Sequence, residues 1–92
     1  MSVELMALVW KTPLPSTEKL VLLTLANWAN DEGHSIYPSV PTLARRTSLT
    51  DRCVQTMLRN LQQQNLLILE GKKASGIHIY SINVENLNEL AL

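Results

Sequence analysis

Apolar residues recur at helical spacing in the segment that starts at Thr50 and ends near Gln63. Four of them follow an i, i+3, i+4, i+7 series and so lie on one stripe of a helix: Val54, Met57, Leu58 and Leu61. Thr50 is a residue type that caps helix N-termini, and Asp51 would lie at the positive end of the helix dipole. The pattern predicts a helix over Thr50–Gln63 with one buried face.

The opposite face of this helix carries only side chains that can contact DNA. At about 100° per residue, it consists of Arg52, Gln55, Thr56, Arg59 and Gln63. These residue types read base edges or hold phosphates, and no Asp or Glu interrupts them. A solvated helix usually mixes acids with bases. The pattern therefore favours a DNA-reading helix over the alternative, an ordinary amphipathic surface helix.

A shorter helix is predicted just before it. Ser39 is a good N-cap, Pro41 fits the first turn, where a missing N–H costs nothing, and the helix should end near Arg46. Thr47–Leu49 then connects this helix to Thr50, the N-cap of the next helix. Two helices joined by three or four residues form a helix-turn-helix, although this turn lacks the glycine that such turns often contain.

A largely buried helix is predicted upstream. Ser16 is its expected N-cap, Glu18 lies in its first turn, and its apolar positions continue through Ala29. Gly33 is expected to stop it, and Ser35–Tyr37 is predicted to form a short extended piece before a proline.

After the DNA-reading helix the pattern changes to period two. Leu66–Leu69 is an apolar run of strand length, Gly71–Gly76 is a polar turn, and Ile77–Ile82 alternates in polarity. These segments predict a β-hairpin whose tip holds Lys72 and Lys73, which suits a wing over the DNA backbone. The predicted fold class is mainly α with a small β-hairpin, a winged helix-turn-helix.

The two ends of the chain lie outside this pattern. Val3–Trp10 is an apolar segment set apart by the prolines of Thr12–Pro15, and it fits a helix capped by Ser2 better than an edge strand. The acidic residues 83–92 fit a short helix or the start of a tether. We therefore divide the chain into an apolar arm (1–13), a DNA-binding domain (14–82) and an acidic tail (83–92).

Composition agrees with one small intracellular domain. Ninety-two residues with 46% hydrophobic content are enough for a single modest core. The lone Cys53 can form no internal disulfide, and no segment has the order of a secretory signal, so we expect a cytoplasmic location. The apolar runs are far shorter than the roughly 20 residues that cross a bilayer, so no membrane partner is expected.

Charge is separated along the chain although the total is zero. Between Ser39 and Tyr80 six basic residues stand against two acidic ones, and elsewhere two basic residues stand against six acidic ones. Because Lys and Arg neutralise phosphates, the +4 segment fits a nucleic-acid partner despite the neutral total.

Catalytic and metal sites are not indicated. His34 and His78 lack metal-ligand spacing, Cys53 has no base defined by the sequence, and no glycine-rich phosphate loop follows a strand. We expect no enzyme activity and no cofactor. Cys53 is expected to be half-buried, His78 to lie on the hairpin surface, and Trp10 and Trp28 to lie in the core.

The order of motifs resembles one family of prokaryotic winged helices. The residues that carry the resemblance are Glu18–Leu23, Ala29–Gly33, Tyr37–Ser39 and Leu43–Ala44. They are similar to the small helix-turn-helix domains of phage and plasmid replication proteins, such as the amino-terminal domain of phage replication protein O, and of related phage regulators. The likeness covers Leu14 to Ile82.

The resemblance implies double-stranded DNA at an origin or an operator as the partner. By position, Ser39 and Thr42 would begin the supporting helix near the backbone, Thr50 would cap the recognition helix, and the groove would be faced by Arg52, Gln55, Thr56 and Arg59. Arg45, Arg46, Lys72 and Lys73 are the expected phosphate contacts. Replication proteins of this type continue into a region that engages the helicase or its loader, whereas this chain stops at Leu92.

Two further expectations concern the apolar arm. It could pair two protomers into a homodimer, because dimers that read two half-sites gain specificity. In the alternative, the winged helix is a protein-interaction module that uses Val3–Trp10 and the acidic tail, and it would then show no salt-sensitive binding to duplex DNA.

Overall fold

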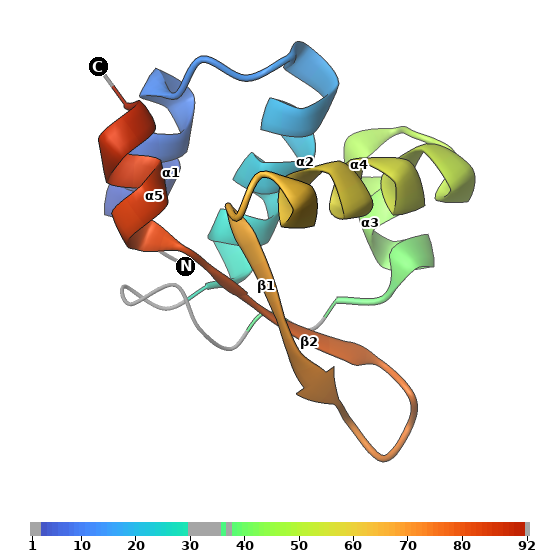
Figure 1. Cartoon of the computed structure of the whole chain (residues 1–92). Helices are drawn as coiled ribbons and strands as arrows, with labels where there is room; N and C mark the ends of the chain where they lie inside the picture. Colours follow the sequence, from blue (N-terminus) through green and yellow to red (C-terminus); the bar gives the residue numbers. More distant parts are fainter. Residues whose placement is uncertain (1–2, 30–35, 37, 92) are drawn as a thin grey trace.

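A computed structural model describes residues 3–29, 36 and 38–91 (Figure 1). Its elements follow the chain in this order: α1 (Val3–Lys11), α2 (Ser16–Trp28), α3 (Val40–Thr47), α4 (Asp51–Gln63), β1 (Leu67–Lys72), β2 (His78–Ile82) and α5 (Val84–Leu90). Some predictions fall on residues outside the described part of the chain. They are the cap at Ser2, the helix stop at Gly33, and the expectations for His34, Ser35 and Tyr37.

Helix α2 is the centre of the core. Val21, Leu22, Leu25 and Ala26 are fully buried, and α1, α3 and α4 all pack against this helix. The predicted N-cap of α2 is wrong. Pro15 takes the cap position in an extended conformation (φ −52°, ψ 146°), and its carbonyl accepts a hydrogen bond from the Lys19 amide at 2.9 Å. Ser16 is therefore the first helical residue, and no side chain caps this end.

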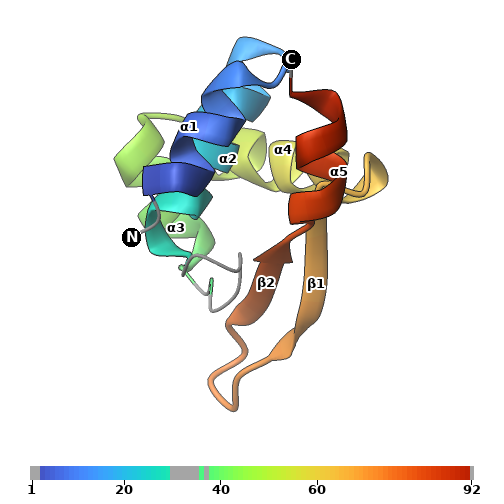
Figure 2. The ribbon, with the colours of Figure 1, turned by 90° about the vertical axis from the view of Figure 1, so that its left-hand side faces the viewer.

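The apolar arm is a helix, as favoured. Leu5 and Val9 of α1 are buried against the core, and Thr12, just after the helix, is fully buried with its hydroxyl donating to the Leu8 carbonyl at 2.9 Å. Figure 2 shows α1 in front of α2 and beside α5. The two ends of the chain thus pack against each other on one side of the molecule.

The core assignment of Trp10 is wrong, and that of Trp28 holds in part. Trp10 is 69% exposed, because it lies on the side of α1 that faces away from Leu5 and Val9. Trp28 is half-buried and packs against the edge of the core.

The hairpin is antiparallel, with Leu67 opposite Ile82, Leu69 opposite Tyr80 and Lys72 opposite His78. A bulge between Leu69 and Gly71 carries β1 further than the sequence predicted, so that Gly71 and Lys72 belong to the strand and not to the turn. On the other edge of β2, Ile36 exchanges two backbone hydrogen bonds with Tyr80 (3.3 and 2.6 Å). The extended piece predicted before Pro38 therefore contributes a single bridge at Ile36.

The acidic tail forms the helix α5, one of its two predicted alternatives. The Asn83 side chain caps it by accepting from the Asn86 amide at 3.2 Å, and Leu87 is fully buried. With α3 and α4 as the two consecutive helices and the hairpin directly after them, the described chain is a mostly helical winged helix-turn-helix, which confirms the predicted fold class.

Candidate nucleic-acid interface

The supporting helix begins with paired hydroxyls. Ser39 caps α3 by accepting from the Thr42 amide at 3.3 Å, and the two hydroxyls lie 2.9 Å apart. Pro41 occupies the first turn, where its missing N–H costs no hydrogen bond. Ser39 is therefore the N-cap that the sequence predicted. Both Ser39 and Thr42 are half-buried at the N-terminus of α3.

The turn between the two helices closes without glycine. Ser48 adopts the left-handed conformation (φ 61°, ψ 28°), and both its amide and that of Leu49 donate to the Ala44 carbonyl. The buried Thr47 hydroxyl donates to the Leu43 carbonyl at 2.7 Å. Ser48 thus takes the place of the glycine that such turns often contain, and only three residues separate α3 from α4.

Helix α4 has the two faces that its sequence predicts. Thr50 accepts from the Cys53 amide at 3.1 Å and caps the helix, while Val54, Leu58 and Leu61 are buried and Met57 and Cys53 are half-buried. The opposite face is exposed at Arg52, Gln55, Thr56, Arg59 and Gln63. The Thr56 hydroxyl donates to the Arg52 carbonyl at 3.1 Å, so its remaining capacity toward a ligand is that of an acceptor.

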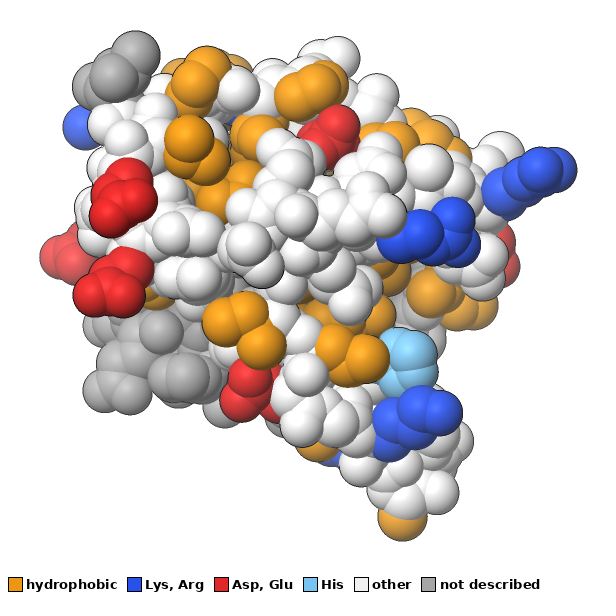
Figure 3. All heavy atoms as spheres, viewed as in Figure 1, with side chains coloured by type: hydrophobic (Ala, Val, Ile, Leu, Met, Phe, Trp, Pro, Cys, Tyr) orange, Lys and Arg blue, Asp and Glu red, His pale blue; other side chains and the backbone are white. Residues whose placement is uncertain are grey.

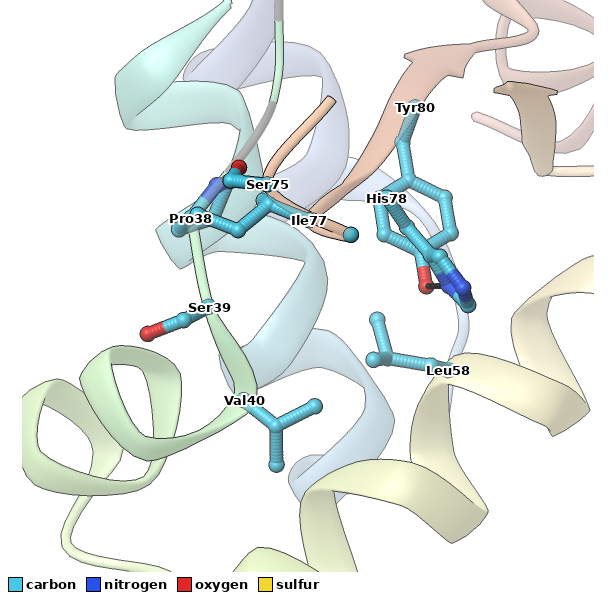
Figure 4. A pocket seen from close by; sticks show the side chains of 9 residues that line it. Pro38, Ser39, Val40, Leu58, Ser75, Ile77, His78 and Tyr80 are labelled. Carbon is cyan, nitrogen blue, oxygen red and sulfur yellow. Dashed lines mark hydrogen bonds between the residues drawn. The ribbon is translucent and has the colours of Figure 1, made fainter. Parts of the chain in front are cut away.

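A groove separates this helix from the wing. Its volume is about 430 Å³, and it is lined by Val40, Gln55, Leu58, Arg59, Gln62, Leu69, His78 and Tyr80. Val40, Leu58, His78 and Tyr80 also line a neighbouring hollow of about 270 Å³, which extends to the hairpin turn (Figure 4). The groove therefore has an apolar floor and a polar rim on α4, the kind of rim that can hydrogen-bond to a ligand.

His78 belongs to this groove, a position that the sequence analysis missed. Its Nδ1 lies 3.3 Å from the Tyr80 hydroxyl, and the two rings meet edge to face with centroids 6.0 Å apart. The ring is half-buried, whereas the sequence placed it on the hairpin surface. In the sequence, His78 and Tyr80 are two residues apart and so lie on the same face of the strand, which could have indicated that both side chains are buried. Only the packing of the hairpin against α4 shows that this face points inward (Figure 4). Burial raises the pKa of the Tyr80 phenol.

The four predicted phosphate contacts lie on two elements, the hairpin and α3. Lys72 and Lys73 are exposed at the far end of the hairpin, where the Lys73 amide donates to the Ile77 carbonyl at 2.8 Å. Arg45 is exposed on α3, but the Arg46 guanidinium lies over the Trp28 ring, 5.5 Å from its centroid. Arg46 lines a separate hollow together with Met6, Leu23 and Trp28. The structure thus sets Arg46 apart from the groove beside α4.

Charge is partly separated in space. Figure 3 shows Lys and Arg side chains along the right-hand side, over α4 and the hairpin, and a group of acidic side chains at the left, where α5 lies, although single acidic side chains also lie elsewhere on this face. Asp51 at the start of α4 and Glu70 on β1 are exposed as well. The described residues contain no group of three or more His, Cys, Asp or Glu side chains that could hold a metal ion. Within the same residues, no helix is long and apolar enough to cross a membrane.

The chain belongs to the helix-turn-helix domain family, whose model matches residues 12–67. This match covers α2, α3 and α4 and ends at the start of the hairpin. Membership of this family suggests DNA binding, and such domains are typically non-enzymatic. No curated protein and no solved structure matches the chain significantly.

Proposed function

We propose that the protein binds double-stranded DNA in a sequence-specific manner, at a replication origin or an operator of a phage or plasmid. The observation that carries the proposal is the exposed face of α4, on which two arginines, two glutamines and a threonine form a surface with no acid. Helix N-caps and packing hold this face rigidly, as base reading requires.

The proposed division of roles follows the geometry. Arg52, Gln55, Thr56 and Arg59 read base edges in the major groove, because α4 is the second helix of the helix-turn-helix. Arg45 and the wing lysines Lys72 and Lys73 hold phosphates, while Ser39, Thr42 and the Thr50 cap lie at the helix ends that meet the backbone. The Arg46 guanidinium lies over the Trp28 ring, away from the groove beside α4. We therefore propose that Arg46 contacts a phosphate outside this groove.

Selection of bound sequences from a random duplex pool would identify the preferred site. Arg59→Ala should then lose roughly 1–3 kcal/mol of discrimination at one base pair. Lys72→Ala should weaken selected and random duplexes alike and lower the slope of log K against log salt by about 1. Glu89→Gln, which changes an exposed charge on α5, is the control and should leave both measurements unchanged.

Two outcomes would contradict the proposal. Equal losses on selected and random DNA for Arg59→Ala would remove the base-reading role of α4. Binding to duplex DNA that does not depend on salt, or no binding at all, would favour the protein-interaction module instead.

A further inference from the structure

Helix α1 presents a second apolar stripe, on the side that faces away from the core. Val3 is 70% exposed and Trp10 is 69% exposed, and Ala7 between them is also exposed. These three positions are spaced i, i+4, i+7, so they form one continuous face of the helix. In a helix that buries Leu5 and Val9, an outer apolar stripe contributes nothing to the core of its own chain.

No described segment covers this stripe. Figure 2 shows α1 at the front of the molecule, with α2 behind it and α5 beside it. The Lys19 ammonium lies 5.8 Å from the centroid of the Trp10 ring and donates to the Trp10 carbonyl at 3.0 Å. This contact places a positive charge over the ring and still leaves most of the indole exposed.

The charges of α1 are arranged so that the stripe complements itself. Glu4 lies in the first turn and Lys11 in the last, both exposed and seven residues apart, hence on the same flank of the stripe. When two such helices lie antiparallel about a two-fold axis, Glu4 of each faces Lys11 of the other. In a parallel pair this flank of one helix and that of the other would lie on opposite sides of the interface, so Glu4 and Lys11 would meet no partner across it.

We propose that α1 pairs antiparallel with α1 of a second copy of this chain. The two-fold axis passes near Ala7, whose small side chain allows close approach, and Trp10 of one protomer covers Val3 of its partner. Helix α4 lies on the opposite side of the molecule from α1 (Figure 1), so the pair leaves both DNA-reading faces open. The inference does not depend on the proposed function, since it concerns the free protein.

The pair is a weak, concentration-dependent dimer. A nine-residue helix is only about 13 Å long, and its outer face is smaller than the roughly 800 Å² that each partner buries in a standard interface. Sedimentation equilibrium of the full chain at submillimolar concentrations should therefore show reversible association. A strict monomer throughout that range would overturn the proposal.

Removal of the indole tests the surface. Trp10→Gln should weaken the association by about tenfold or more, because the indole supplies the largest apolar side chain of the stripe and tryptophans often carry much of the free energy of an interface. Ile68→Gln is the matched control, since Ile68 is an exposed apolar residue on β1 (40%) and its replacement should leave the association unchanged. Equal effects of both substitutions would place the contact elsewhere. Circular dichroism would show that both variants keep the native fold.

A charge swap tests the antiparallel arrangement. Glu4→Lys and Lys11→Glu should each weaken the dimer by about three- to tenfold, because each converts two attractive pairs into repulsive ones. The double variant Glu4→Lys/Lys11→Glu should restore the wild-type association. An association of the double variant no tighter than that of the single variants would overturn the antiparallel arrangement. Thermal unfolding of each variant would show whether a weaker association results from unfolding of α1 and not from the changed charges.

Discussion

The Glu18 carboxylate accepts a hydrogen bond from the Gln64 side-chain amide at 2.5 Å, across 46 positions of sequence. Glu18 lies in the first turn of α2 and is only 9% exposed, and Gln64 is the C-cap residue directly after α4. The bond therefore ties the end of the proposed DNA-reading helix to the central helix of the core.

Loss of this bond should destabilise the protein. Gln64→Ala leaves the nearly buried carboxylate without its partner, which costs about 1–3 kcal/mol of unfolding free energy. Urea denaturation measures this change. Gln63→Ala is the control, because Gln63 is exposed on the same helix and its loss should cost less than about 0.5 kcal/mol. Equal losses in the two variants would show that the bond does not stabilise the fold.

Glycine at position 48 should stabilise the helix-turn-helix. Ser48 has a left-handed backbone (φ 61°), which costs a residue with a Cβ atom roughly 1 kcal/mol relative to glycine. We expect Ser48→Gly to raise the unfolding free energy by about 0.5–1 kcal/mol, with Ser75→Gly, in the wing turn, giving no gain. Thermal unfolding of the two variants would decide, and a lower melting temperature for Ser48→Gly would contradict the expectation.

The cap of α4 should be worth a measurable part of the stability. Thr50→Ala removes the acceptor of the Cys53 amide hydrogen bond and should cost about 0.5–2 kcal/mol, whereas Thr50→Ser should keep it. Thr24→Ala serves as the control, because the Thr24 hydroxyl donates to a carbonyl of its own helix that is already hydrogen-bonded. A Thr50→Ser variant as unstable as Thr50→Ala would argue against the cap.

Stability should fall at alkaline pH because of Tyr80. Burial raises the pKa of its phenol above the ordinary value, so the folded protein keeps a proton that the unfolded chain loses above about pH 10. The unfolded state then binds fewer protons, and the unfolding free energy decreases as pH rises from about 10 toward the higher folded pKa. Tyr80→Phe should show a smaller decrease between pH 8 and 11 than the wild type. The same slope in both proteins would refute this origin.

Local sequence predicted the parts of the interface whose geometry is local. The Ser39 and Thr50 caps and the two faces of α4 depend on hydrogen bonds and periodicity within a few residues, and the structure confirms them. The predictions for Ser16 and Trp10 were wrong because other residues determine the positions of these two. Ser16 lost the cap position because the extended Pro15 already supplied the acceptor, and Trp10 is exposed because Leu5 and Val9 occupy the core side of α1.

The sequence by itself therefore determined the order of the elements, the winged helix-turn-helix class and the acid-free face of α4, because these follow from periodicity, capping and charge within single segments. Only the tertiary structure decided the groove at His78, the stacking of Arg46 on Trp28 and the bond between Glu18 and Gln64. These three contacts join residues from different elements, and their partners are chosen by how the helices and the hairpin pack around α2, which no local pattern encodes.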